Sequence, residues 1–230
     1  MPMNDRFTSP LFTSMRFIAQ RTMLKPLVWT LTRVEVHGRK NLKALPPSFI
    51  VVANHSSHLD APLVMGSIPW GNARFLAAGA AADYFFDVAW RKWLTALFFN
   101  AFPVDRGGNR KSAGLSKALL ERDVPLLIFP EGGRSKEGVL GHFKPGAAAL
   151  AISSNVPCLP VAIVGANVAM PRGQSWPSNG RLRVGVVFGS PMRHDSGESA
   201  EAFSLRLARE VVRLHSSISI AGVPPIEVKE

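Results

Sequence analysis

The stretch FIVVANHSSHLD, residues Phe49 to Asp60, joins a fully apolar run to a group of polar residues. An apolar run without polar alternation is typical of a strand that is buried on both faces, as in sheets covered by helices on either side. Ligand sites of such α/β sheets lie where the strands end, at their carboxyl edge. The stretch therefore predicts a layered α/β fold and places a candidate site at residues 54 to 60.

Outward from this stretch, short apolar runs alternate with segments of helical periodicity. The order of these segments indicates an α/β domain with a mixed β-sheet flanked by helices. The last helix is the clearest, because Phe203, Leu207 and Val211 fall on one face and Arg206 and Arg209 on another. We predict strands over 49–53, 74–78, 125–129, 158–164 and 182–188, and helices over 58–67, 87–99, 110–122, 145–153 and 198–218.

The N-terminal segment, residues 1–33, is predicted to contain a basic amphipathic helix over residues 11–23 that Pro26 ends or kinks. This pattern fits a helix that lies in a membrane surface, and it fits equally a helix that packs on its own domain. We divide the rest of the chain into a main domain, 34–220, and a tail, 221–230. The expected helix places Leu11, Phe12, Met15, Ile18, Ala19 and Met23 on one side and Arg16, Gln20 and Arg21 on the other.

The composition bounds the class of protein. The 230 residues are 47% apolar, enough for one domain with an ordinary core, and this argues against a disordered chain. The net charge of +11 implies an anionic partner, whether nucleic acid, anionic lipid or a phosphorylated substrate. Cys158 is the single cysteine, which excludes an intrachain disulfide and a cysteine-based metal site.

The distribution of charge and hydropathy gives expectations about location. Residues 1–48 contain eight Lys or Arg against two acidic residues, so the positive charge is concentrated there. Charged residues interrupt each candidate for a signal peptide, and no run is long and apolar enough to span a bilayer. We therefore expect a protein on the cytoplasmic side of the inner membrane, in peripheral contact with it.

The polar end of the opening stretch carries the first candidate site. A histidine followed five residues later by an aspartate can bring the carboxylate to one imidazole nitrogen and leave the other as a general base. The alternatives are a capping box between Ser57 and Asp60, and a metal site built from His55, His58 and Asp60. The sequence contains no second ligand cluster that would complete a metal site. We therefore expect no bound metal and treat His58 as a surface or pocket-lining residue.

Two further segments can bind anions. Glu131, Gly132, Gly133, Arg134 and Ser135 form a Gly-rich turn after the predicted strand 125–129, and arginine pairs with phosphate through two parallel hydrogen bonds. The segment 105–112 resembles the end of a P-loop but has arginine at position 110, where glycine is required. The P-loop interpretation therefore fails, and Arg106 remains as part of a basic cluster that can bind an anion. Either segment could instead be a solvated turn.

Together these motifs resemble the glycerolipid acyltransferase family, whose best-known members are lysophosphatidate acyltransferases. The four segments have the family's order and spacing over about residues 34–190: 54–60, 102–106, 129–135 and 156–161. The run 143–146 is also similar. Two departures concern the acceptor site: Pro103 interrupts the second motif, and Gly133 stands where threonine is commoner.

The resemblance implies a fold, a reaction and a set of site residues. It implies the glycerolipid acyltransferase fold, with His55 as the catalytic base and Asp60 as the residue that orients it. It assigns the phosphate of the acceptor to Arg106, and assigns Glu131, Gly132, Gly133, Arg134, Ser135 and Lys144 to substrate binding. No metal and no cofactor are implied, and acyl-CoA or acyl-carrier protein serves as co-substrate.

The implied reaction is transfer of a fatty acyl group to the hydroxyl of a lysophospholipid, with lysophosphatidate giving phosphatidate as the first expectation. Glycerol-3-phosphate and a lyso-ornithine lipid are alternative acceptors. The implied partners are the acyl donor, the lysophospholipid and an anionic membrane surface, and no nucleic acid is expected. A rival from another class is a non-enzymatic cationic module that binds membrane or nucleic acid, although no nucleic-acid-binding motif is found.

Overall fold

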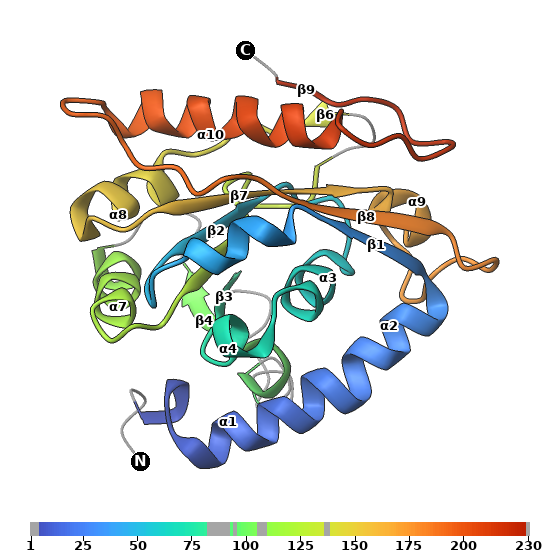
Figure 1. The fold of residues 1–230 in the computed structure, drawn as a ribbon, viewed down its shortest axis with the longest axis horizontal. Helices are drawn as coiled ribbons and strands as arrows, with labels where there is room; N and C mark the ends of the chain where they lie inside the picture. The colour runs from blue at the N-terminus through green and yellow to red at the C-terminus, as the bar shows by residue number, and fades with distance from the viewer. Residues whose placement is uncertain (1–4, 82–92, 94–95, 105–109, 136–138, 229–230) are drawn as a thin grey trace.

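The computed structural model describes residues 5–81, 93, 96–104, 110–135 and 139–228 (Figure 1). Within these residues seven strands form one sheet in the order β1-β8-β7-β2-β5-β3-β4. Neighbouring strands are parallel except β7 and β8, so the sheet is mixed, as predicted. The strands are β1 (Arg33–His37), β2 (Ile50–Ala53), β3 (Ala77–Ala81), β4 (Phe102–Val104), β5 (Leu126–Ile128), β7 (Cys158–Val164) and β8 (Arg183–Phe188).

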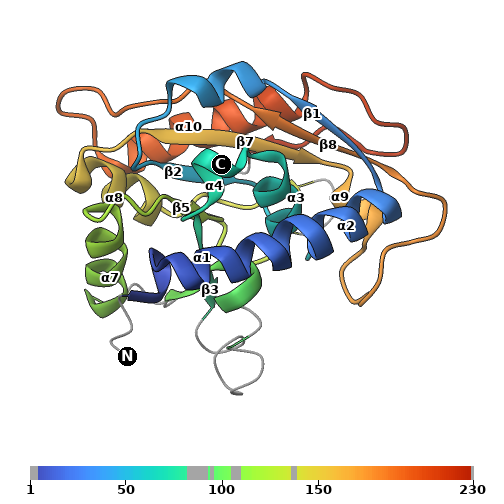
Figure 2. The same cartoon turned by 60° about the horizontal axis from the view of Figure 1, so that its bottom comes forward.

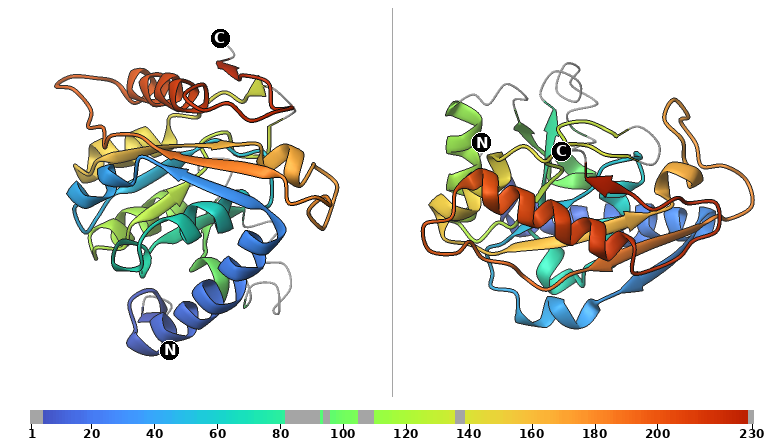
Figure 3. Two further views of the ribbon diagram at one scale, coloured as in Figure 1. Left: turned by 45° about the vertical axis from the view of Figure 1, so that its right-hand side comes forward. Right: turned by 90° about the horizontal axis from the view of Figure 1, so that it is seen from above.

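Helices cover both faces of this sheet (Figure 1). The helix α10 lies along one face with α8 beside it, and α3 lies on the opposite face (Figure 3). A separate two-stranded sheet, β6 (Val139–Leu140) with β9 (Glu227–Val228), involves the predicted tail. The helices are α1 (Pro10–Phe17), α2 (Lys25–Leu31), α3 (Asp60–Ser67), α4 (Trp70–Ala73), α7 (Arg110–Leu120), α8 (Gly146–Ser154), α9 (Ala166–Ala169) and α10 (Ala200–His215), with short 3₁₀ helices η1 (Asp5–Phe7) and η3 (Arg39–Ala44) and a π-helix η2 (Ile18–Leu24).

The position of β2 between two layers of helices explains why its sequence is apolar throughout. Ile50 and Val52 join the core beneath α10, whereas Val51 and Ala53 join the core beneath α3. All four residues are fully buried. A strand with helices on both faces has no solvent side, so the period-2 alternation of a half-exposed strand is absent. The polar residues that follow are the first in this segment that can reach solvent.

The N-terminal helix is turned with its polar side inward. The elements α1, η2 and α2 form one continuous helical rod across the molecule (Figure 2). Arg16 and Gln20 are buried, whereas Leu11, Ile18 and Met23 are more than half exposed. Gln20 Nε2 donates to Phe98 O of the domain at 2.6 Å, and Arg16 donates to the carbonyls of Arg6 and Phe7 and to Asn100 Oδ1. Ala19, predicted on the apolar side, is also buried, and Val28 joins the core, so polar and apolar contacts together attach the rod.

Comparison with the sequence shows which predictions held. The fold class is confirmed, and each of the five predicted strands corresponds to an observed one, although β3 begins at Ala77 rather than at 74. The helical rod does not end at Pro26 but continues to Leu31, with π-helical hydrogen bonding just before the proline. Most of the predicted helix 87–99 lies outside the described residues. The strands β1 and β4 were not predicted, because β1 carries three charged or titratable residues and β4 has only three residues, one of them proline.

Candidate active site

The candidate site forms where three central strands end. The strand β2 lies between β5 and β7 and is parallel to both, so the carboxyl ends of these strands meet at one edge. The turn after β2 carries residues 54–59, and the segment after β5 carries residues 129–135. The two are in direct contact, because Ser135 N donates to His55 O at 2.7 Å. Two motifs that are far apart in the sequence thus share one site.

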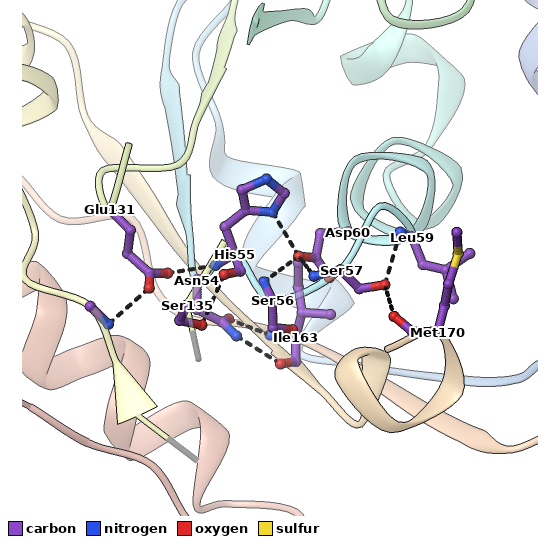
Figure 4. Close-up of polar contacts among 11 residues, drawn as sticks. Asn54, His55, Ser56, Ser57, Leu59, Asp60, Glu131, Ser135, Ile163 and Met170 are labelled. Carbon is purple, nitrogen blue, oxygen red and sulfur yellow. Dashed lines mark hydrogen bonds and ion pairs between the residues drawn. The ribbon is translucent and has the colours of Figure 1, made fainter. Parts of the chain in front are cut away.

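The side chains of His55 and Asp60 are paired (Figure 4). His55 Nδ1 lies 2.8 Å from Asp60 Oδ2, and the same oxygen accepts the backbone N–H groups of Ser56 at 2.6 Å and Ser57 at 2.8 Å. A carboxylate oxygen that accepts two amide N–H groups has no proton to donate, so the imidazole is the donor in the third contact. Nδ1 therefore carries the proton, and Nε2 is left basic. The Asp60 side chain is fully buried, whereas that of His55 is 23% exposed. Within the described residues Nε2 has no hydrogen-bond partner.

The alternative role of Asp60 as a helix cap is present only in part. Its carboxylate accepts the Ser57 N–H, which is one half of a capping box. The other half is missing, because Ser57 Oγ donates to Met170 O at 2.9 Å and accepts from Leu59 N. His58 is exposed, and in the described part of the chain no group of three or more potential ligands could hold a metal ion. The pair is therefore better described as an imidazole with an orienting carboxylate.

The segment after β5 holds the main chain of His55. Glu131 Oε1 accepts the His55 N–H at 2.6 Å, and His55 O accepts both the backbone N–H and the hydroxyl of Ser135, at 2.7 and 2.9 Å. The ring of Phe129 stacks on the imidazole with the centroids 4.3 Å apart. The main-chain N–H and carbonyl of His55 thus contact Glu131 and Ser135 (Figure 4), and its ring contacts Phe129 of the same segment.

Glu131 reaches a second backbone amide. Its Oε2 accepts the Gly141 N–H at 2.8 Å, so the carboxylate links the turn after β2 to the residue after β6. Burial raises the pKa of Glu131 to about 7, because desolvation outweighs the two amide hydrogen bonds. The neighbouring Gly132 has φ of +70°, a left-handed conformation that favours glycine. This explains one glycine of the motif by backbone geometry.

The predicted anion-binding residues lie around this pair at different depths. Arg134 is partly exposed, and partial burial together with the charge of Arg134 lowers the pKa of His58. Lys144 is exposed, with its ammonium group beside Gly132. Arg106 lies outside the described residues. The described part of the site therefore gathers His55, Asp60, Glu131 and Ser135 closely, with the cationic side chains nearer to solvent.

Two other residues of the motifs were given no role by the sequence. The amide of Asn54 donates to Ile163 O at 2.9 Å and accepts from Ile163 N at 2.7 Å, which ties the end of β2 to β7. Phe129 supports the imidazole ring. The signal for Asn54 was its place directly after a buried strand, where an amide can complete the ladder to a neighbour. Phe129 opens the motif 129–135, but its ring contact with His55 was not predicted, since apolar strand residues read as core.

Comparison with known proteins places these features in a family. The model of the family described as Acyltransferase matches residues 33–164. A 1-acyl-sn-glycerol-3-phosphate acyltransferase of Chlamydomonas reinhardtii is 30% identical over 157 residues, 67% of this chain and 44% of that protein. The alpha enzyme of the same name from Homo sapiens is 28% identical over 199 residues, 83% of this chain and 66% of that protein. The chain thus spans about half to two thirds of the length of these relatives.

A solved structure shares the fold. The crystal structure of the 1-acyl-sn-glycerophosphate (LPA) acyltransferase PlsC from Thermotoga maritima matches with a TM-score of 0.71 and 24% sequence identity, over 91% of this chain and 80% of that one. The matched share includes more than the 33–164 core. The sheet and its covering helices therefore form one known architecture.

Proposed function

The chain belongs to the Acyltransferase family, and we propose that it transfers a fatty acyl group from a thioester donor to the hydroxyl of a lysophospholipid, lysophosphatidate first. The observation that carries this proposal is the His55–Asp60 pair, which leaves one basic ring nitrogen partly exposed and unbonded within the described residues. Relatives named as 1-acyl-sn-glycerol-3-phosphate acyltransferases support the acceptor. The donor is acyl-CoA or acyl-carrier protein.

In the proposed mechanism His55 Nε2 takes the proton of the acceptor hydroxyl while that oxygen attacks the thioester carbonyl. The carbon–sulfur bond of the tetrahedral intermediate then breaks, and the thiolate leaves and takes up a proton. Asp60 keeps the proton on Nδ1 and stabilises the imidazolium that forms, because its Oδ2 lies 2.8 Å away. A thiolate is a good leaving group, so no covalent acyl-enzyme is required.

The phosphate of the acceptor is proposed to lie against the cationic side chains. Arg134 follows the turn that contacts His55, and Lys144 lies beside Gly132 of the same turn. Arginine forms two parallel hydrogen bonds to phosphate, whereas lysine contributes a point charge. Arg106 is proposed as a third cation on the basis of its motif. A phosphate held here would place the acceptor near the base.

The test is thiol release from palmitoyl-CoA by the purified protein in lipid vesicles, with and without lysophosphatidate. We expect acceptor-dependent release that His55→Ala lowers by ~10² to 10⁴ and that His37→Ala, a change of an exposed histidine on the edge strand β1, leaves unchanged. Arg134→Ala should mainly raise the acceptor KM, with Arg209→Ala on α10 as the matched control. No acceptor-dependent release with a panel of lyso-lipids and a carrier-protein donor would overturn the proposal.

The N-terminal helix is proposed to rest on an anionic membrane surface. Its exposed residues include Leu11, Ile18 and Met23, each more than half accessible. An apolar helix face that the protein itself leaves uncovered is suited to the boundary between headgroups and acyl chains, and the net positive charge favours anionic lipids. No helix in the described ranges has the length and hydropathy to cross a bilayer. The contact proposed is therefore interfacial.

This contact is tested by sedimentation with vesicles of phosphatidylglycerol and phosphatidylcholine. Replacement of Leu11, Ile18 and Met23 by serine should abolish binding without loss of the far-UV circular dichroism signal. Leu205→Ser is the matched control, because Leu205 is also exposed and lies on α10, on the other side of the sheet (Figure 1). Equal binding by the triple variant and the wild type would overturn the proposal.

A further inference from the structure

The carboxylate of Glu131 contacts main-chain groups of two separate segments. Oε1 accepts the N–H of His55 at 2.6 Å, and Oε2 accepts the N–H of Gly141 at 2.8 Å. The side chain therefore lies between the turn after β2 and the residue after β6. These contacts do not require a bound substrate, and they differ from the acceptor-binding role that the motif implied.

We propose that Glu131 is a positioning residue: one carboxylate oxygen fixes the main chain of the base His55 by accepting its N–H, the other anchors the carboxylate on the N–H of Gly141, and Glu131 acts on the reaction through His55. This inference rests on the proposed function, since it concerns the base of that reaction. Ser135 completes the arrangement from the other side, because its N–H and hydroxyl both donate to His55 O. The N–H and the carbonyl of His55 are thus both held by the 129–135 segment.

The chemistry of the side chain explains why glutamate stands at this position. Two N–H donors need two acceptor oxygens, and a carboxylate supplies both. A glutamine would supply one oxygen and turn an NH₂ donor toward the second amide. The burial that raises the pKa of Glu131 to about 7 makes an ionised group costly here, so its retention is in keeping with a role in the site. The charged or titratable groups that face it are His55 and Asp60.

The lack of a side chain at Gly141 leaves the space that this carboxylate occupies. A Cβ added to Gly141 would lie 2.7 Å from Glu131 Oε2, closer than real side chains approach. The φ angle of Gly141 is not in the left-handed region, so its backbone does not require glycine. The substitution Gly141→Ala therefore displaces the carboxylate of Glu131 without altering any group that could bind a phosphate.

With palmitoyl-CoA and lysophosphatidate as substrates, we expect Glu131→Gln to lower kcat by ~10²-fold, the loss that follows from a displacement of about 1 Å at a reacting group. The acceptor KM should change by less than about threefold. Gly141→Ala should lower kcat in the same way. Glu198→Gln is the matched control, because Glu198 also accepts a backbone N–H, that of Asp195, at the surface before α10. A raised acceptor KM with kcat retained in Glu131→Gln would overturn the proposal and return Glu131 to acceptor binding.

A second readout separates this proposal from the proposed function. The ¹⁵N and ¹H signals of the His55 ring report its Nδ1 hydrogen bond and do not depend on any substrate. We expect these signals to move in Glu131→Gln and Gly141→Ala and to stay in place in Glu198→Gln. If the wild type releases no thiol with any acceptor, the proposed function fails, while the ring signals still decide the positioning role. Unmoved signals in both variants would overturn it.

Discussion

Two parts of this molecule bury polar side chains, with opposite charges and with different kinds of partner. In the turn after β2, the fully buried Asp60 accepts three hydrogen bonds on one oxygen, all from residues 55 to 57. Beneath the N-terminal helix, the buried Arg16 donates to the carbonyls of Arg6 and Phe7 and to the side chain of Asn100. The acid is held by its own turn, whereas the cation joins distant segments.

The difference explains what each cluster is suited to do. Asp60 faces a titratable imidazole, so its charge can stabilise a proton on His55 during a reaction. Arg6, Arg16 and Arg21 face carbonyl oxygens, and in the part of the chain that the structure describes none of them forms an ion pair with a carboxylate. A carbonyl oxygen orients the arginine side chain that it binds, but it does not exchange a proton with it. The arginines therefore orient the helix so that Leu11, Ile18 and Met23 face outward, and the acid orients a base.

The strongest test of this difference is Asp60→Asn. Asparagine can keep the three donors on one oxygen, as Oδ2 does now, but it loses the negative charge that stabilises the imidazolium and buries an NH₂ group where Oδ1 has no partner. We expect kcat to fall by ~10² to 10⁴ in the thiol-release assay, with Asp195→Asn at the exposed loop before α10 as the control. Retained kcat in Asp60→Asn, with His55→Ala inactive, would show that Asp60 serves the turn alone.

Glu131, which lies beside the His55–Asp60 pair, should also make the stability of the protein depend on pH, which the buried arginines cannot do. The folded-state pKa of Glu131 is about 7, above its ordinary value of 4.5. Below pH 4.5 the group is protonated in both states, and above pH 7 the folded protein carries a buried charge, so the free energy of unfolding falls as pH rises between these values. The loss is at most about 3 kcal/mol. Arg16, whose pKa burial lowers to about 10, stays charged throughout.

The measurement is urea denaturation of the wild type and Glu131→Gln at several pH values from 4.5 to 7. Burial lowers the pKa of His215 to about 4, and this residue adds stability as pH rises over almost the same range. Because both proteins contain His215, its contribution cancels in their difference. We expect the wild type to lose stability relative to the variant as pH rises. A difference that stays constant with pH would show that Glu131 does not titrate in this range.

The arginine cluster is tested by Arg16→Met, which keeps the length of the side chain and removes its donors. Two carbonyls and the Asn100 amide oxygen lose a partner in a buried place. We expect the free energy of unfolding to fall by about 2 kcal/mol, as measured by urea denaturation, with the exposed Arg172→Met unchanged. Equal stability of the two variants would show that the helix does not depend on this contact.

The same comparison shows what could be predicted from the sequence. The order of layers and the five main strands followed from apolar runs, because β2 is buried on both faces and shows it in its composition. The His55–Asp60 juxtaposition followed from spacing across a strand-to-helix turn. The catalytic role of the pair and the acceptor-binding roles of Arg106, Arg134 and Lys144 stay predictions.

Other features depended on tertiary contacts that no local pattern contains. Periodicity alone does not say which side of the N-terminal helix faces the domain, and here Arg16 and Gln20 of the predicted polar side do, together with Ala19 of the predicted apolar side. The contacts of Glu131 were equally hidden, because its partners are main-chain amides at positions 55 and 141. In both cases the partners are main-chain groups: carbonyls for the helix, and amides for Glu131. Every residue carries such groups, so the sequence does not mark them.

The smallest expected effect separates two adjacent glycines of the turn that holds His55. Gly132 has φ of +70°, so Gly132→Ala forces a left-handed alanine and should cost about 1 kcal/mol or more of stability. A Cβ at Gly133 would meet nothing within 4 Å, so Gly133→Thr should change stability by less than about 0.5 kcal/mol. Thermal denaturation of both variants tests this pair. If Gly133→Thr also lowers the acceptor KM, the added hydroxyl faces the acceptor, and the outer side of the turn binds substrate while Glu131 and Ser135 hold the base.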